Sequence, residues 1–164
     1  MLKSKIKSLQ ELKKIIATLK AKGKRIVFTN GCFDLLHYGH VKYLKQAKRK
    51  GDILVVAVNS DASVKRIKGD KKPIVKEEDR LGVIAALESV DYVVRFNEET
   101  PLNTIKMLRP DILVKGSDWL RNRIVGSNFV QGYKGKVVTI KLVSGRSTTD
   151  LIRKIVKVFA KKKH

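Results

Sequence analysis

The chain has 164 residues, 43% of them hydrophobic, so it is long enough for one domain with a substantial core. Its single cysteine excludes an internal disulfide, and no uncharged run is long enough for a bilayer, so we expect a cytoplasmic protein without membrane insertion. Lys and Arg number 37 against 15 Asp and Glu, a net charge of +22 that attracts anions. The favoured interpretation is a solvated lysine-rich surface, with nucleic acid, anionic membranes and phosphorylated small molecules as open alternatives.

Two helix starts are marked in the sequence. Residues 8–11 read SLQE, a capping box, and apolar residues then recur at helical spacing as far as Gly23. Thr100 is expected to be an N-cap, with Pro101 at the first helical position. The helices expected from these and similar patterns cover residues 8–22, 39–50, 77–89, 101–108, 125–133 and 150–160.

Short apolar runs lie between the expected helices. Residues 53–58 are continuously apolar, as in a strand that is buried on both faces. The polar stretch 59–76 is longer than an ordinary connection, which predicts a functional loop. Strands are expected at residues 26–29, 53–58, 91–96, 111–114 and 137–142.

The alternation of helices and strands predicts an α/β fold. We expect a single domain with a Rossmann-like, doubly wound sheet of five parallel strands. Ligands of such sheets bind at the carboxyl ends of the strands, where the strand order reverses. The loops after the first, fourth and fifth expected strands are therefore where a site is predicted.

The loop after the first expected strand carries two histidines. Residues 29–40 read TNGCFDLLHYGH, which places His37 and His40 three apart at a helix start, on one face. Gly39 between them lets a ligand approach the backbone, and the free amides of the helix start favour phosphate. The imidazoles can donate hydrogen bonds to phosphate oxygens as charge develops. The alternatives are surface histidines or a metal pair, for which Asp34 is the near third ligand.

A hydroxyl-rich segment precedes the last expected helix. Residues 144–149 read SGRSTT, and hydroxyls in this position can cap the helix and bond phosphate oxygens. An N-cap cluster alone is the simpler interpretation of this segment. The functional interpretation gains weight only when the segment is paired with the histidine loop.

Three basic residues fit a phosphate site. Lys68 lies before Gly69, Arg80 opens a helix, and Lys115 ends the fourth strand at the edge where ligands bind. Arg80 can instead pair with Glu77 or Asp79 on its own helix. Any one lysine in so basic a chain can also be an ordinary surface residue.

The two motifs resemble those of a known family. GCFDLLHYGH at residues 31–40 is similar to the signature of the His-x-Gly-His nucleotidyltransferases, and residues 145–149 resemble the segment that closes over their nucleotide. A closer resemblance is to the D-glycero-β-D-manno-heptose 1-phosphate adenylyltransferases of lipopolysaccharide synthesis. It runs from about Lys24 to the last helix. The stretches that carry it are residues 29–34, 57–63, 68–73, 86–91, 113–119 and 145–149.

The resemblance implies domain boundaries, an activity and site residues. Residues 1–23 would form an N-terminal helix, 24–160 the nucleotidyltransferase domain and 161–164 a basic tail. It implies transfer of AMP from ATP to the heptose phosphate, with Mg²⁺ held mainly by phosphates and by no protein side chain. His37, His40 and Lys68 are implied in catalysis, and Asn30, Asp34, Lys68, Arg80 and Lys115 in binding the sugar phosphate. The nucleotide-binding residues implied are Gly31, Cys32, Phe33, His37, His40, Gly116, Asp118, Trp119, Gly145, Ser147, Thr148 and Thr149.

Some positions depart from the pattern of the resembling family. Ser117 stands where a second glycine is common, Asn128 near a common acidic residue, and Arg146 where Ile or Tyr is frequent. Cys32 is not expected to be a nucleophile, although a helix start can lower the pKa of a thiol. Trp119 can either stack on the base or pack in the core.

Several alternatives stay open. A glycerol-3-phosphate cytidylyltransferase, an FAD synthetase or the use of CTP would fit the same motifs. A nucleic-acid-binding domain would fit the charge, but the sequence contains no helix-turn-helix, zinc-finger or aromatic-interleaved basic motif, so no specific nucleic acid is expected. The resemblance also suggests a homodimer.

Overall fold

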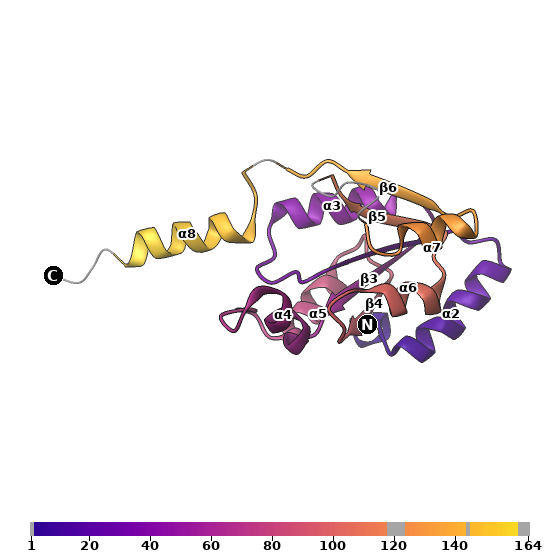
Figure 1. Ribbon diagram of the computed structural model, residues 1–164, viewed down its shortest axis with the longest axis horizontal. Coiled ribbons are helices and arrows are strands. Elements are labelled where there is room, and N and C mark those ends of the chain that lie inside the picture. Colours follow the sequence, from indigo (N-terminus) through magenta and orange to yellow (C-terminus); the bar gives the residue numbers. More distant parts are fainter. Residues whose placement is uncertain (1, 118–123, 144, 161–164) are drawn as a thin grey trace.

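The computed structural model describes residues 2–117, 124–143 and 145–160, and it places a parallel sheet between two layers of helices (Figure 1). The strands are β1 (Ile6–Lys7), β2 (Ile26–Gly31), β3 (Ile53–Asn59), β4 (Tyr92–Phe96), β5 (Ile112–Gly116) and β6 (Lys136–Ile140). The helices are α1 (Leu2–Lys5), α2 (Leu9–Ala21), α3 (Tyr38–Lys48), α4 (Asp61–Lys68), α5 (Glu77–Ala86), α6 (Leu102–Leu108), α7 (Ser127–Gly132) and α8 (Thr148–Phe159).

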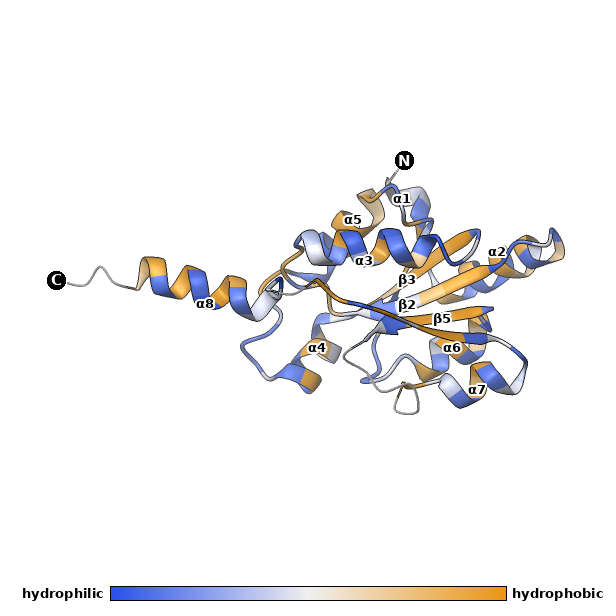
Figure 2. Cartoon of the chain, turned by 90° about the horizontal axis from the view of Figure 1, so that it is seen from above, coloured by the Kyte–Doolittle hydropathy of each residue, from blue (hydrophilic) through white to orange (hydrophobic). Residues whose placement is uncertain are grey.

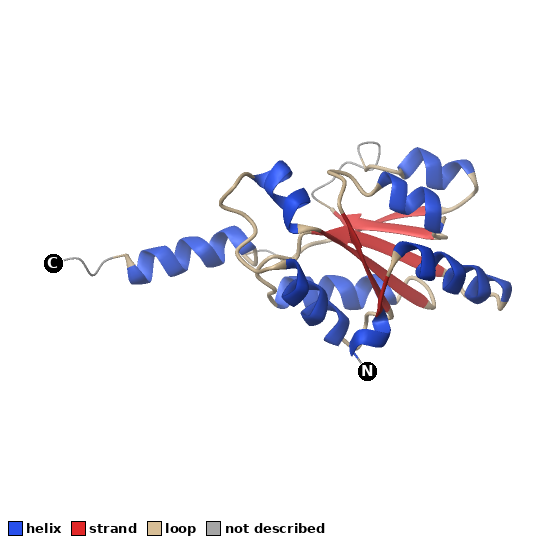
Figure 3. Cartoon of the chain, turned by 90° about the horizontal axis from the view of Figure 1, so that it is seen from below, coloured by secondary structure: helices blue, strands red, loops and turns tan. Residues whose placement is uncertain are grey.

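The sheet is doubly wound around β2. Its strand order is β1-β4-β3-β2-β5-β6, and every neighbouring pair is parallel (Figure 3). The chain therefore moves outward from β2 through β3 to β4, and then returns to the other side of β2 with β5 and β6. The reversal of strand order lies between β2 and β5, which is where ligands bind in sheets of this kind.

Three expectations about the elements were wrong in detail. The sheet has six strands rather than five, because the two-residue strand β1 pairs with β4 at one edge and is too short to leave a pattern. The stretch 59–76 contains a helix, α4, whose N-cap Ser60 accepts the amide of Ser63. Pro101 is itself the N-cap of α6, so that helix starts one residue later than expected.

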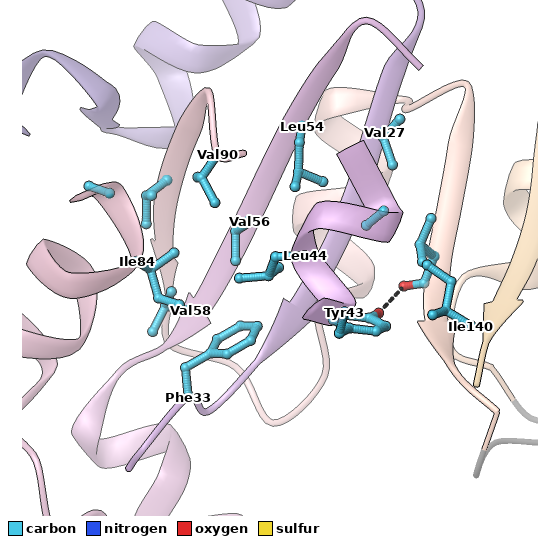
Figure 4. Packing of buried hydrophobic residues seen from close by; sticks show 14 of the residues in the cluster. Val27, Phe33, Tyr43, Leu44, Leu54, Val56, Val58, Ile84, Val90 and Ile140 are labelled. Carbon is cyan, nitrogen blue, oxygen red and sulfur yellow. Dashed lines mark hydrogen bonds between the residues drawn. The ribbon is translucent and has the colours of Figure 1, made fainter. Parts of the chain in front are cut away.

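The core lies on both faces of the sheet because alternate strand residues point to opposite sides. In β3, Leu54, Val56 and Val58 pack with α3 and α5, whereas Val55 and Ala57 pack with α2, α6 and α7. Figure 2 shows the central strands as the most apolar part of the chain, and Figure 4 shows the cluster beneath α3. The N-terminal helix α2 begins with the predicted capping box and joins this core.

The strands β2 and β5 separate toward their carboxyl ends. β2 pairs with β3 over six positions, from Ile26 to Gly31, but with β5 only at Val27 and Phe28. The buried Tyr43 of α3 lies across the divergence, with its hydroxyl 2.7 Å from Thr29 Oγ1 and donating to the Val114 carbonyl at 3.2 Å (Figure 4). A crevice is therefore built into the sheet at its switch point.

Helix α8 differs from the other helices, because it projects away from the body (Figures 1 and 3). None of its residues is buried, and its apolar side chains include Phe159, which is 76% exposed. Within the described ranges, no helix has both the length and the apolar character needed to span a membrane.

Candidate active site

A cavity of about 370 Å³ opens at the carboxyl ends of β2 and β5. The loop after β2, the start of α3, the end of β5 and the segment before α8 all contribute to its walls. Its lining residues are Asn30, Gly31, Cys32, Phe33, Asp34, His37, Gly39, His40, Tyr43, Lys68, Lys115, Gly116, Leu142, Val143, Arg146, Ser147, Thr148 and Thr149.

The two sequence motifs meet across this cavity. His37 and His40 lie on one wall, and the hydroxyl-bearing residues 147–149 lie on the other. The Thr148 hydroxyl donates to the Leu35 carbonyl at 3.4 Å, which joins the two walls directly. At the start of α8, Ser147 is the N-cap and accepts the amide of Asp150. The juxtaposition expected from the sequence is thus present.

The two imidazoles are stacked, and their surroundings lower the pKa of both rings. Their ring centroids are 3.8 Å apart with an angle of 19° between the planes. His40 Nδ1 accepts the backbone amide of His37 at 3.4 Å, which leaves the ring proton of a neutral His40 on Nε2. Burial, then the neighbouring His37, then Lys68 lower the pKa of His40 to about 4. His40 is therefore a neutral imidazole and a hydrogen-bond donor at neutral pH.

The room for His37 is provided by Gly39. A Cβ on Gly39 would lie 2.9 Å from the His37 ring and 3.3 Å from Arg146 Cβ. The glycine therefore admits two protein side chains, whereas the sequence interpretation reserved this space for a ligand. Burial and then the charge of Arg146 lower the pKa of His37, and its buried Nδ1 has no hydrogen-bond partner among the described residues.

The backbone of the loop after β2 is held in an unusual conformation. Phe33 has φ of 47°, and its buried ring packs edge-on against His40 at a centroid distance of 5.4 Å. A Cβ on Gly31 would lie 3.1 Å from that ring, so a larger residue there would require the ring to shift by a few tenths of an ångström. Burial raises the pKa of the Cys32 thiol, contrary to the lowering considered from the sequence, so the thiol stays protonated at neutral pH.

Two lysines reach the cavity from different elements. Lys68 is the last residue of α4, before Gly69 with φ of 88°, and Lys115 lies near the end of β5. Lys115 Nζ lies 3.5 Å from the Asn30 carbonyl oxygen. The Asn30 side-chain oxygen is buried without a partner in the described part of the chain. Lys68, Lys115 and Asn30 all line the cavity.

Arg80 is placed beneath the site rather than on the surface of its helix. It is 1% exposed, and its guanidinium donates to the carbonyls of Val75, Cys32 and Asn59 at 2.6–3.0 Å. Its ion-pair partner is Asp61 at 2.7 Å, so the alternative pairing with Glu77 or Asp79 is wrong. Arg80 joins the loops after β2 and β3 to the segment before α5 and does not line the cavity between the two motifs.

Like Arg80, Asp34 connects the loop after β2 to the segment before α5. Its carboxylate accepts the amides of Ile74 and Val75 at 2.8 and 2.9 Å, and Lys72 lies 3.4 Å away. The side chain is therefore tied to the segment before α5, although the residue borders the cavity. Its oxygens do not converge with the histidines on a metal, and no group of three potential metal ligands occurs among the described residues.

Some predicted residues lie outside the described ranges, and some lining residues were missed. Asp118, Trp119, Ser144 and the basic tail 161–164 are not described by the structure. Tyr43 was missed, although it lies one further helical step from His40 on α3. Arg146 was noted only as a departure from the family pattern, and it lies in the cavity wall.

Comparisons with known proteins agree on one family. The family model described as Cytidylyltransferase-like matches residues 28–162. The chain is 54% identical over 156 residues to the Bifunctional protein HldE of Geobacter sulfurreducens, which covers 95% of this chain and 32% of that protein. A similar protein of the same name from Campylobacter fetus subsp. fetus is 54% identical over 151 residues. The chain thus spans about a third of the length of these relatives.

Solved structures give the same result for the fold. The lipopolysaccharide core biosynthesis protein from Thermoplasma volcanium is 33% identical with a TM-score of 0.65, and the match covers 74% of this chain and all of that one. A pantoate-beta-alanine ligase from Francisella tularensis, solved with beta-gamma ATP and beta-alanine, has a TM-score of 0.64 at 15% identity. The latter likeness concerns the fold alone.

Proposed function

The chain belongs to the cytidylyltransferase-like family, and from that premise we propose that it transfers AMP from ATP to D-glycero-β-D-manno-heptose 1-phosphate. The products would be ADP-heptose, a precursor of the lipopolysaccharide core, and pyrophosphate. The observation that carries the proposal is the single cavity that is lined by both the histidine pair and residues 147–149. The similar lipopolysaccharide core biosynthesis protein supports the lipopolysaccharide context, and the motif resemblance described above supports the sugar.

In the proposed reaction, an oxygen of the sugar phosphate attacks the α-phosphorus of ATP. A new phosphorus–oxygen bond forms in line as the bond to the β-phosphate bridging oxygen breaks, and pyrophosphate leaves with the electron pair. The protein acts by positioning and by charge stabilisation, as phosphoryl-type transfers require. The neutral His40 donates its Nε2 proton in a hydrogen bond to an α-phosphate oxygen, where negative charge grows in the transition state.

Basic side chains hold the two anionic reactants in this proposal. Lys68 and Lys115 line the cavity, and we assign them to the α-phosphate and the acceptor phosphate. Arg146 flanks the β- and γ-phosphates beside His37, and the hydroxyls of Thr148 and Thr149 bond the nucleotide. Each contact puts a cation or a donor against phosphate oxygens in a partly desolvated site, where such bonds are strongest.

Mg²⁺ is proposed as a partner of the phosphates rather than of the protein. The described cavity wall offers imidazoles, lysines and hydroxyls, and its carboxylate, Asp34, already accepts two amides and faces Lys72. Oxygen ligands for a hard cation would therefore come mainly from ATP and water. When bound, the ion would neutralise charge on the leaving pyrophosphate.

The test is a substrate screen that measures pyrophosphate release. The protein is incubated with ATP or CTP and, in turn, heptose 1-phosphate, glycerol 3-phosphate and FMN. Release with ATP and heptose 1-phosphate alone supports the proposal. Faster release with CTP and glycerol 3-phosphate, or with ATP and FMN, would replace it by the corresponding activity of the same family.

We also propose a homodimer in which the apolar face of α8 is covered by a second copy. The exposed apolar residues of α8 are Leu151, Ile155, Val156, Val158 and Phe159. An isolated helix of this length is marginal in water, so its apolar face needs a partner.

Charge on the neighbouring surface favours a second copy as that partner. Leu151 and Ile155 line an apolar cavity with Val83 of α5, and α5 begins with the exposed Glu78 and Asp79. The polar side of α8 carries three basic residues, Arg153, Lys154 and Lys157, which complement that acidic turn. Light scattering should give twice the chain mass, and V158D should reduce it to the monomer whereas K154Q should not. A monomeric unsubstituted protein would contradict this proposal.

A further inference from the structure

A second cavity adjoins the one between the two motifs. It has a volume of about 320 Å³ and lies between the carboxyl ends of β2 and β3, the end of α4 and the start of α6. Five residues line both cavities, so the two spaces meet at one junction. The shared residues are Asn30, Gly31, Cys32, Lys68 and Lys115.

The junction is positively charged, as a place where two phosphate groups meet must be. Lys68 and Lys115 are the two basic residues that line both cavities. Two phosphates that must approach within bonding distance repel each other strongly in a partly desolvated site, and cations between them remove most of that cost. One cavity holds the nucleotide motifs, so the other is the space left for the second reactant.

The residues first expected to bind the acceptor sugar do not fill this role. Arg80 is buried with its donors directed to Val75, Cys32, Asn59 and Asp61. The Asp34 carboxylate is occupied by the segment before α5. Neither side chain lines the second cavity, so sugar recognition has to come from other residues.

We infer that the second cavity binds the sugar of a phosphorylated sugar acceptor, with Glu99 and Thr100 selecting its hydroxyls; this inference rests on the proposed function. Glu99 and Thr100 follow β4, and both line the cavity. The Glu99 side chain is 65% exposed and lies 3.9 Å from Arg66 Nε, which leaves carboxylate oxygens to accept two neighbouring hydroxyls. A carboxylate here also disfavours acceptors with a second anionic group.

The remaining walls fit the body of a sugar. Ile67, Pro101, Ile124 and Val125 provide apolar surface for the carbon–hydrogen faces of the ring. Asn30 also lines this cavity, and its backbone carbonyl oxygen lies 3.5 Å from Lys115 Nζ. The acceptor therefore lies with its phosphate at the two lysines and its hydroxyls toward the loop between β4 and α6.

The experiment compares E99Q and T100V with the unsubstituted protein and with E98Q as the matched control. Glu98 is the adjacent carboxylate and bonds Asn97 and Asn103 instead of facing the cavity. Initial rates of pyrophosphate release are measured against sugar phosphate at saturating ATP, and against ATP at saturating sugar phosphate. We expect E99Q to raise the KM for sugar phosphate about tenfold, since a charge-assisted hydrogen bond is lost. T100V should raise it about threefold, and the KM for ATP should not change.

Two outcomes overturn the inference. One is an unchanged KM for sugar phosphate in E99Q, and the other is an equal rise in the KM for ATP, which would indicate a general structural effect. Calorimetric binding of heptose 1-phosphate to the complex with a non-hydrolysable ATP analogue separates this inference from the proposed function. If heptose 1-phosphate binds, E99Q weakens that binding, and the protein still does not turn over ATP with heptose 1-phosphate, then the proposed function is contradicted and the sugar site is retained. If ATP and heptose 1-phosphate are turned over but E99Q binds heptose 1-phosphate as tightly as the unsubstituted protein does, then the proposed function is retained and the sugar site is contradicted.

Discussion

The two walls of the cavity between the two motifs are held in very different ways. The histidine wall, formed by the loop after β2 and the start of α3 from Gly31 to His40, is tied to the body by the buried Arg80 and by Asp34. The hydroxyl wall, residues 145–149, leads into α8, which has no buried residue. Its link to the other wall is the bond from Thr148 to the Leu35 carbonyl. One wall is thus preorganised by the core, and the other is secured mainly by local capping.

This contrast separates two kinds of effect. Changes beneath the histidine wall should lower stability or kcat, because they disturb groups that are already in place for the transition state. Changes in the hydroxyl wall should act mainly on the KM for ATP, because in the proposed complex that wall contacts the nucleotide and the core holds it less firmly. The following predictions test the contrast, beginning with the largest effect.

The largest expected effect is the loss of Arg80. R80M removes a buried guanidinium and leaves the carbonyls of Cys32 and Asn59 without their donor, so the free energy of unfolding should fall by about 3–5 kcal/mol. Urea denaturation measures it. The control is R95M, which breaks an exposed pair with Glu77 and should cost less than about 1 kcal/mol. Equal losses in the two variants would show that the loop is not anchored as described.

Replacing His40 should have the largest effect on turnover. H40A removes the donor to the α-phosphate, so kcat should fall by roughly a hundredfold or more with little change in the KM for ATP. Pyrophosphate release at saturating substrates measures this. Y38A, a change at a 62% exposed ring two positions away, should keep normal turnover. Normal turnover in H40A would remove the assigned role.

Arg146 tests the hydroxyl wall. R146A should raise the KM for ATP about tenfold and alter kcat little, because one cation beside the phosphates is lost. The pKa of His37 should also rise toward its ordinary value, since the charge of Arg146 contributes to lowering it. The control is R153A, a change on α8 at a residue paired with Asp150. A fall in kcat alone would place Arg146 with the histidine wall.

Removing the N-cap of α8 should have a smaller effect on helix stability and on the KM for ATP. S147A removes the acceptor of the Asp150 amide, and the loss of such a cap destabilises a helix by about 1 kcal/mol. Amide exchange in the first turn of α8 should quicken, while exchange in β2 and β3 should stay unchanged. The KM for ATP should rise only about twofold to fivefold. Quicker exchange throughout the sheet would show that α8 is coupled to the core.

The imidazole titration is the finest test of the histidine wall. Because burial, His37 and Lys68 oppose its protonation, His40 in the free protein should titrate near pH 4 by NMR rather than near 6.5. The unfolded chain binds this proton near pH 6.5 and the folded chain does not, so stability should fall as pH decreases from about 6.5 to about 4. H40Q should lack this part of the pH dependence. A midpoint near 6.5 would mean that the ring is solvated.

The sequence predicted the regular elements and the meeting of the two motifs well, because both depend on periodicity and strand order. The parallel sheet follows from the alternation of helices and strands, and the capping box at Ser8 follows from the local pattern of residues 8–11. Strand β1 was missed because Ile6–Lys7 is too short to show a period, and α4 was missed because Asp61–Lys68 is too polar.

The roles of individual polar residues were harder to predict. A sequence does not show whether an arginine such as Arg80 points outward or inward, because that depends on carbonyls from distant loops. The space beside Gly39 was assigned to ligand, although His37 and Arg146 occupy it. Spacing identified the residues of the site, whereas the packing of the loops decided which of them face the cavity.

The divergence of β2 and β5 affects the rate at which a ligand such as a nucleotide associates with the protein. Because Tyr43 bridges Thr29 and Val114, the crevice is already open in the folded chain, and no strands need to separate when a ligand arrives. The free energy needed to part the strands is therefore met during folding and does not reduce the affinity. With a strongly cationic surface to draw anions inward, capture of nucleotide should be limited by diffusion and should slow as salt is added.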